Sequence, residues 1–200
     1  MSPRINVSEA RKNQILDAAA IVFARQGFYQ ARMDDIVAES GLSKGTLYWY
    51  FKSKDDIITA LLQRVFDEDL IQLQSAQHTA GSAVERVIGL SRHIAADFTE
   101  IARLVPITFE FYAVASRQEH IRIFLKEYLQ AYHAILQNIV QQGIDTQELR
   151  PVDAKDVATT IVAIYEGLLL LWVVDAEHID WHTQPEISIR LLFDGLRRLL

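Results

Sequence analysis

The chain has 200 residues, half of them hydrophobic, and carries a formal net charge of −6. This length and composition predict a soluble globular protein and exclude a disordered or collagen-like chain. The lack of cysteine excludes disulfides and thiolate metal sites, and the polar N-terminal segment lacks the apolar core of a secretory signal, so we expect a cytoplasmic location.

Charge is distributed unevenly along the chain. Residues 1–54 hold eight Lys and Arg against five Asp and Glu, and residues 55–200 hold twelve against twenty-one, which gives net charges of +3 and −9. A basic segment joined to an acidic one would approach phosphates in one orientation. Chance variation over so short a segment is an alternative explanation, so charge alone does not identify a partner.

Apolar residues recur with helical spacing through nearly the whole chain, and no convincing stretch alternates between apolar and polar residues as a strand would. The sequence therefore predicts an all-α fold. The first helix carries one apolar stripe, formed by Ile15, Ala19, Val22 and Phe23. Gly27 then provides a signal for the end of this helix.

Residues 33–51, with the sequence MDDIVAESGLSKGTLYWYF, predict a helix-turn-helix. Ile36 faces inward from a first short helix and Leu47 from a second one. Gly41 permits the tight bend between them, and Ser43 is placed to cap the second helix. Large polar aromatic residues surround the small buried face of the second helix, which is rare in a helix that has only a structural role.

A helix this short fits the major groove with its N-terminal end nearest the base edges. Lys44 and Thr46 are therefore the candidates for base contacts. The DNA backbone would be gripped by Tyr48, Tyr50, Lys52 and Lys54 together with the amides of Ser43 and Gly45. Trp49 would stack or wedge against sugar edges. For each aromatic residue, packing within the small domain is the alternative, most of all for Tyr50.

The helix end RQGF and the segment MDDIVAESGLSKGTLYWYFKSKDDI together resemble the DNA-binding signature of TetR (tetracycline repressor) family transcriptional regulators. The resemblance implies a three-helix DNA-binding domain over residues 1–54 and a helical effector-binding and dimerisation domain over residues 55–200. It also implies DNA-facing roles for Ser43, Lys44, Gly45, Thr46, Tyr48, Trp49, Tyr50 and Lys54.

One departure from the family pattern concerns the start of the second helix. The family usually has a threonine pair there, and this chain has Ala31 and Arg32. The usual hydroxyl cap and its phosphate contact are therefore missing. We expect Arg32 to replace that contact by its charge.

Four later helix starts share a capping signature, in which a hydroxyl residue is followed three positions later by an acid. The pairs are Ser53 with Asp56, Ser82 with Glu85, Ser116 with Glu119, and Thr183 with Glu186. They predict helices near 54–77, 83–100, 117–142 and 184–199. Further helices near 102–115 and 153–175 bring the expected total to about nine.

Several aromatic and polar residues of the middle helices are candidates for an effector pocket, because such side chains line cavities that hold apolar ligands. Packing in the core is the alternative for each of them. The candidates are His93, Phe98, Phe109, Glu110, Tyr112, Tyr128, Tyr132, Tyr165, Glu166 and Trp172. His178 and His182 form only a weak metal pattern, so we expect neither a metal nor a cofactor.

The segment 157–174 approaches the length of a membrane span. Glu166 near its middle and the acidic residues at both ends argue against spanning, so we expect no membrane. A helix this apolar must be covered on two sides, by the chain's own core and by a second subunit. The expected homodimer residues, with core packing as the alternative, are Ile161, Leu168, Leu171, Ile189, Leu192, Phe193 and Leu196.

These patterns predict a sequence-specific transcriptional regulator, with repression expected and activation left open. Its partners would be a palindromic operator in double-stranded DNA and a small, largely apolar effector of unknown identity. The alternative is a DNA-binding dimer without an effector. An enzyme is remote, because the sequence has no Gly-rich phosphate loop, no HExxH, no GxSxG and no cysteine.

Overall fold

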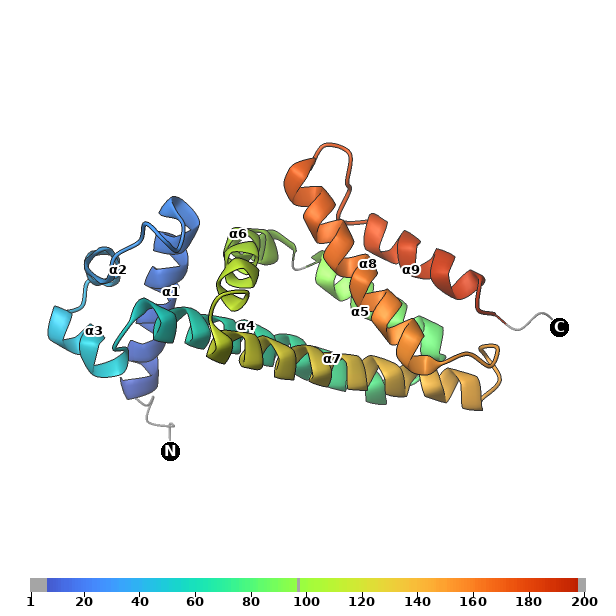
Figure 1. Cartoon of the computed structure of the whole chain (residues 1–200). Coiled ribbons are helices and arrows are strands. Elements are labelled where there is room, and N and C mark those ends of the chain that lie inside the picture. The colour runs from blue at the N-terminus through green and yellow to red at the C-terminus, as the bar shows by residue number, and fades with distance from the viewer. Residues whose placement is uncertain (1–6, 97, 198–200) are drawn as a thin grey trace, which may run out of the picture. The chain divides into compact units, whose positions relative to one another are not determined.

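The computed structural model describes residues 7–96 and 98–197, and for residues 68, 69, 98–101, 103, 104, 106 and 107 it describes the backbone alone. Within this part of the chain all regular structure is helical (Figure 1). The helices are α1 (Val7–Gln26), α2 (Met33–Ser40), α3 (Lys44–Tyr50), α4 (Lys54–His78), α5 (Ala83–Ala96), α6 (Phe98–Ala115), α7 (Glu119–Asp145), α8 (Ala154–Val174) and α9 (Gln184–Asp194). The predicted all-α fold is confirmed.

The helices form two compact units. The head unit comprises the residues up to 66 and residues 103–122, and the body unit comprises residues 67–102 and those from 123 onward. The chain passes from one unit to the other within α4, α6 and α7. Each unit is therefore built from segments that lie far apart in the sequence.

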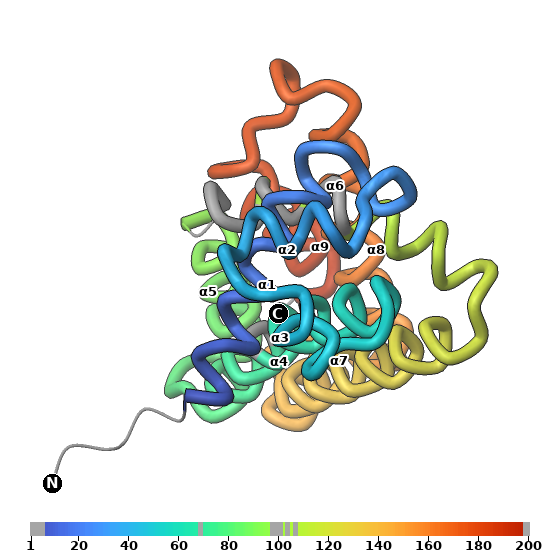
Figure 2. The backbone as a smooth tube through the Cα atoms, turned by 90° about the vertical axis from the view of Figure 1, so that its left-hand side faces the viewer, coloured from blue at the N-terminus to red at the C-terminus, as the bar shows by residue number. Residues whose placement is uncertain are grey.

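The core of the head unit begins with the predicted stripe on α1. Ile15, Ala19, Val22 and Phe23 are all buried there, which confirms this expectation. Gly27 follows in the left-handed conformation, with φ 78°, and ends the helix. In Figure 2, α1, α2 and α3 face the viewer, and α3 follows α2 across a short turn.

Two of the four predicted capping boxes are confirmed. The Ser53 hydroxyl accepts from the Asp56 amide at 3.1 Å while the Asp56 carboxylate accepts from the Ser53 amide at 3.0 Å. Ser82 and Glu85 exchange the same two bonds, each at 3.1 Å. Each box satisfies two amides that the first turn of a helix leaves without partners.

The other two predicted boxes are wrong. Ser116 donates its hydroxyl to the Ala113 carbonyl at 2.7 Å, which closes α6, so α7 starts only at Glu119. Thr183 donates to the Asp180 carboxylate at 2.7 Å and makes no cap. The structure describes α5 as far as Ala96 and α6 from Phe98, and the residue between them lies outside the described residues.

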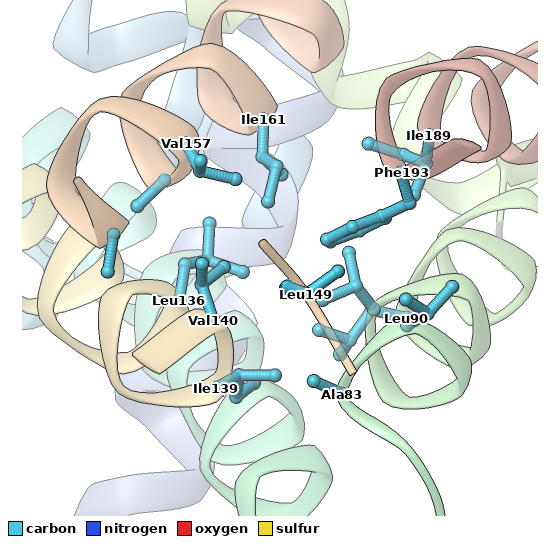
Figure 3. Close-up of a cluster of buried hydrophobic side chains, with 14 of the residues drawn as sticks. Ala83, Leu90, Leu136, Ile139, Val140, Leu149, Val157, Ile161, Ile189 and Phe193 are labelled. Carbon is cyan, nitrogen blue, oxygen red and sulfur yellow. The ribbon is translucent and has the colours of Figure 1, made fainter. Parts of the chain in front are cut away.

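The main core of the body unit is a large apolar cluster. Figure 3 shows Val157 and Ile161 of α8 facing Ile189 and Phe193 of α9 across the cluster, over residues of α7 and α5. Leu149, from the loop after α7, lies among them and is 1% exposed. Burial of this many branched and aromatic side chains is the main term that stabilises the unit.

α8 is long and apolar enough, by length and composition alone, to cross a membrane, and its most apolar 18-residue window has a mean hydropathy of 2.1. A core helix of a globular protein passes the same test. Only 22% of its most apolar window is buried within the chain. The cluster of the body unit therefore covers a minor part of α8, and apolar side chains remain on its open side.

An ion-pair network joins α5 to α9. The Glu186 carboxylate accepts from Arg92 Nε at 2.7 Å and from Arg190 Nε at 2.8 Å. These hydrogen bonds lower the pKa of Glu186 from 4.5 to about 2. Because the pKa is lower in the folded state, the resulting stability is present above pH 4.5 and is lost as the pH falls through 2.

We predict that Glu186→Gln lowers the free energy of unfolding at pH 7 and flattens its decrease in acid. Urea denaturation between pH 7 and pH 3 would measure both effects. Glu177→Gln, which removes the same charge from an exposed position, is the matched control. If the free energy of unfolding of Glu186→Gln falls between pH 7 and pH 3 as steeply as that of the parent protein, Glu186 is not the source of the acid sensitivity.

Candidate nucleic-acid interface

The turn between α2 and α3 is fixed by one glycine and one serine. Gly41 has φ 65°, a left-handed conformation that side chains disfavour. The buried Ser40 hydroxyl donates to the Val37 carbonyl at 3.0 Å and accepts from the Leu42 amide at 3.3 Å. Gln14 of α1 donates to the Ser40 carbonyl at 2.7 Å. The turn predicted from the sequence is confirmed, and α1 holds it in place.

α3 is oriented by its cap and by its only buried residue. The Ser43 hydroxyl accepts from the Thr46 amide at 3.1 Å, as predicted, and lies 2.8 Å from the Thr46 hydroxyl. Leu47 is completely buried, and Phe51, directly after the helix, is 5% exposed. With these two side chains inward, the remaining surface of α3 points away from the core of the head unit.

We call this remaining surface the reading face, formed by Lys44, Gly45, Thr46, Tyr48, Trp49 and Tyr50. Lys44, Gly45 and Trp49 are exposed, and the other three are half-buried. The Trp49 side chain is 68% exposed and stands edge-on to the Tyr50 ring at 4.6 Å. Tyr50 donates its hydroxyl to Ser8 Oγ at 3.3 Å. An indole in solvent serves no core, so its place on this face points to an external partner.

The charges around the reading face are partly paired. Lys44 Nζ lies 2.6 Å from Asp34 Oδ1 on α2 and 5.9 Å from the centre of the Tyr48 ring. The hydrogen bond to Asp34 raises the pKa of Lys44. Lys52 donates to the Tyr48 carbonyl at 2.6 Å. Arg32, at the start of α2, has an exposed side chain.

Lys54 lies apart from the other predicted DNA contacts. Its ammonium group donates to the carbonyls of Phe28 at 2.5 Å and Tyr29 at 3.2 Å, and it sits 4.7 Å from the Phe28 ring. Burial lowers its pKa. These contacts direct the Lys54 charge to the loop between α1 and α2, so we predict that Lys54 supports this loop and contributes no phosphate contact.

Glu110 of α6 reaches the same loop from another element. Its carboxylate accepts a hydrogen bond from the Phe28 amide. A Cβ at position 27 would lie 2.7 Å from Glu110 Oε1, so the glycine there lets the carboxylate approach. The two backbone groups of Phe28 are thus held by side chains of opposite charge. The anionic Glu110 binds the amide, and the cationic Lys54 binds the carbonyl.

Comparison with known proteins identifies the family. One family model, described as bacterial regulatory proteins of the tetR family, matches residues 15–61, and a second, described as the C-terminal part of BetI-type transcriptional repressors, matches residues 89–200. The chain belongs to the TetR family. It is a transcriptional regulator, and its relatives in the family are regulators and not enzymes.

Individual relatives agree with this assignment. The chain is 33% identical to the HTH-type transcriptional regulator YfiR of Bacillus subtilis strain 168, over 76% of this chain and 75% of that protein. It is similar to the structure of FadR from Bacillus subtilis in complex with stearoyl-CoA, with 26% identity, a TM-score of 0.77, and coverage of 92% and 99%. A putative regulator from Saccharomonospora viridis in complex with choline shares the fold, with 21% identity, a TM-score of 0.85, and coverage of 96% and 100%.

The effector residues expected for this TetR-family protein fall into different units. Phe109, Glu110 and Tyr112 belong to the head unit, and the side chain of Phe98 lies outside the described residues. The body unit holds His93, Tyr128, Tyr132, Tyr165, Glu166 and Trp172. A hollow of about 440 Å³ in the body unit is lined by other, mainly charged residues from α5, α9 and the segments that flank them, with Glu148 from the loop after α7, and includes none of these.

Within the body unit the expected effector residues have different surroundings. Tyr165 packs against the main cluster and shares a 2.5 Å hydrogen bond with the buried Ser91 hydroxyl. Burial raises the pKa of Tyr165 to about 12, so the phenol stays neutral. Trp172 packs against the second cluster, which contains Leu168 and Trp181. His93 is exposed.

Most of the expected dimer residues lie in the core of the body unit. Ile161, Leu168, Ile189, Phe193 and Leu196 are at most 8% exposed, and Leu192 packs partly against the same cluster. The first five side chains are thus covered by the chain's own core, and Leu192 is covered in part. Leu171 alone is well exposed, at 53%.

Two features of the surface escape the sequence analysis. The first is Asp34, whose contact with Lys44 depends on how α2 and α3 cross. The second is a set of exposed apolar residues on α8 and α9 beside the expected Leu171, namely Leu170, Val173, Val174, Ile187 and Leu191. The spacing of four between Ile187 and Leu191 is visible in the sequence, but it does not tell which side of α9 is covered.

We predict that Lys54→Met destabilises the protein by about 1–2 kcal/mol, because the carbonyls of Phe28 and Tyr29 lose a charged donor. The salt dependence of DNA binding should stay unchanged. Lys126→Met is the control, since Lys126 is exposed and lies outside the reading face. Urea denaturation and binding titrations at several salt concentrations would test both variants. A flatter salt dependence with unchanged stability would restore Lys54 as a phosphate contact.

Proposed function

We propose that this TetR-family regulator is a cytoplasmic repressor. Two head units of a homodimer would bind a palindromic operator, and a small, largely apolar effector bound by the body would release the DNA. The observation that carries the proposal is the reading face, where one short capped helix presents lysine, hydroxyl and aromatic groups outward over a single buried leucine.

The reading face supports a division of labour on DNA. Lys44 and Thr46, at the start of α3, are suited to base edges in the major groove. Backbone phosphates would be contacted by the second group, which consists of Arg32, Tyr48, Tyr50 and Lys52 with the amides of Ser43 and Gly45. Trp49, the most exposed of these aromatic residues, would stack against sugars.

The second copy of the chain would cover the open side of α8 and α9. Leu170, Leu171 and Val174 share one face of α8, and Ile187 and Leu191 share one face of α9. Contiguous apolar surface of this kind marks an interaction site. A second copy is the favoured occupant, because reading a palindrome requires two heads and the same patch on both copies forms a closed twofold contact.

Small residues support close packing of a partner helix at this surface. Ala163 is exposed and Gly167 is half-buried, and together with Leu171 they follow a spacing of four along α8. A Cβ added at Gly167 would meet no atom within 4 Å. The surface thus has room for another helix, and an apolar side chain of the partner would fill it.

The effector proposal rests on the body unit. Related structures carry dissimilar molecules, namely triclosan in SmeT, stearoyl-CoA in FadR and choline in the Saccharomonospora viridis regulator. In this chain the hydroxyls of Ser91 and Tyr165 form an uncharged hydrogen-bonded pair beside an apolar cluster. That chemistry favours an uncharged, largely apolar effector. A dimer without an effector is the alternative, and a screen in which no compound releases DNA would support it.

The first test selects bound fragments from the genomic DNA of the source organism with the purified protein. We expect a palindrome with half-sites about 34–36 Å apart, or a multiple of that spacing. Lys44→Ala and Thr46→Ala should reduce the preference for this operator over mixed-sequence DNA about tenfold each. Lys126→Ala, at an exposed position on α7, controls for charge. Equal recovery of all fragments by the parent protein would refute the proposal.

The second test concerns the homodimer. Leu191→Asp places a charge on the most exposed leucine of α9, 69% exposed, and should convert the dimer to monomers in sedimentation experiments. Ile71→Asp makes the same change on α4, at a residue that is 62% exposed, and should leave the dimer intact. Dimers that persist with Leu191→Asp would move the interface elsewhere.

A further inference from the structure

We infer that Asp34 is a specificity-determining residue of the reading face. In the free protein its carboxylate holds Lys44, and on the operator it accepts a hydrogen bond from the amino group of a base. The inference rests on the proposed DNA-binding function and deepens it. The side chains predicted from the sequence to contact DNA are all cationic, hydroxyl-bearing or aromatic, and a carboxylate adds the opposite selectivity.

Asp34 is not needed to build α2. The helix start is completed by the next acid, Asp35, which accepts from the Arg32 amide at 2.8 Å and from Gln26 Nε2 at 3.0 Å. These bonds lower the pKa of Asp35, with the Arg32 amide as the main cause. Asp34, in the same turn, points instead to Lys44 Nζ at 2.6 Å. The side chain of Asp34 therefore contacts the reading face and takes no part in capping α2.

The ion pair between Asp34 and Lys44 is weak enough for Lys44 to leave it for an acceptor on DNA. The two side chains are 68% and 61% exposed, and an exposed ion pair of this kind is weak. Guanine O6 and N7, or a phosphate, offer Lys44 an equivalent acceptor. Until such an acceptor arrives, the carboxylate neutralises the lysine and lowers the attraction of the reading face for DNA of any sequence.

The carboxylate discriminates between sequences once Lys44 has moved to the DNA. It has acceptor oxygens and no donor, so it repels phosphates and the acceptor atoms of guanine and thymine. In the major groove an exocyclic amino group satisfies it, and cytosine N4 is the usual partner of Asp and Glu. A site that offers guanine to Lys44 and cytosine to Asp34 satisfies both groups, whereas guanine or thymine opposite Asp34 leaves its carboxylate facing acceptors.

Asp34→Asn tests the inference, because it keeps the shape of the side chain and removes the charge. Asp17→Asn is the matched control: Asp17 is also an exposed acid of the head unit, it pairs with Arg64 at 2.8 Å, and its loss changes the net charge equally. Asp34→Ala checks that the new amide makes no contact of its own. Dissociation constants would be measured at several salt concentrations for the selected operator and for a mixed-sequence duplex of equal length.

We expect Asp34→Asn and Asp34→Ala to bind the mixed-sequence duplex about three- to tenfold more tightly, since Lys44 is released and a repelling charge is gone. The ratio of operator to mixed-sequence affinity should fall at least about threefold, and fragments selected by the variants should lose a cytosine preference. Asp17→Asn should shift both affinities by the same factor.

Two other outcomes would overturn the inference. If the variants of Asp34 shift both affinities equally, as Asp17→Asn does, the residue acts through net charge alone. The proposed function would stand in that case, because the parent protein would still discriminate. If the parent protein shows no sequence preference, the proposed function and the role of Asp34 fail together.

Discussion

α3 has seven residues, and a helix of that length is unstable in water unless other parts of the protein hold it. Its position depends on the burial of Leu47, on the Ser43 cap and on the left-handed Gly41 before it. These three residues fix the orientation of α3 and therefore the direction in which every side chain of the reading face points. A change at Leu47 would therefore affect every DNA-facing group together, whereas a change at Trp49 would affect only its own contact.

The loop between α1 and α2 is the second support of the head unit. Lys54 binds the carbonyl of Phe28 and Glu110 accepts from its amide, so charged groups from α4 and α6 hold the two ends of one residue. Partial burial of two opposite charges is tolerable because each finds a backbone partner. The contact also explains why residues 103–122, from the middle of the chain, pack within the head unit.

The sequence was sufficient for features that depend on neighbouring residues. The stripe on α1, the bend at Gly41 and the boxes at Ser53 and Ser82 require partners within a few positions, and the structure confirms each. The pattern at Thr183 failed because its acid, Glu186, binds Arg92, which is 94 positions away. The contacts of Lys54 were out of reach for the same reason, since its partners at Phe28 and Tyr29 are distant in sequence.

The dimer surface illustrates a different limit. The most apolar 18-residue window of α8 has a mean hydropathy of 2.1, so no polar face tells which side meets the core. Val157, Ile161 and Leu168 are covered by the body unit, while Leu171 and Val174 stay outside, although all five are equally apolar. Hydrophobic burial is proportional to area and has no direction. The choice between inner and outer face is therefore made by the helices that α8 packs against, and the face left apolar outside the core is the one that a second subunit can bury.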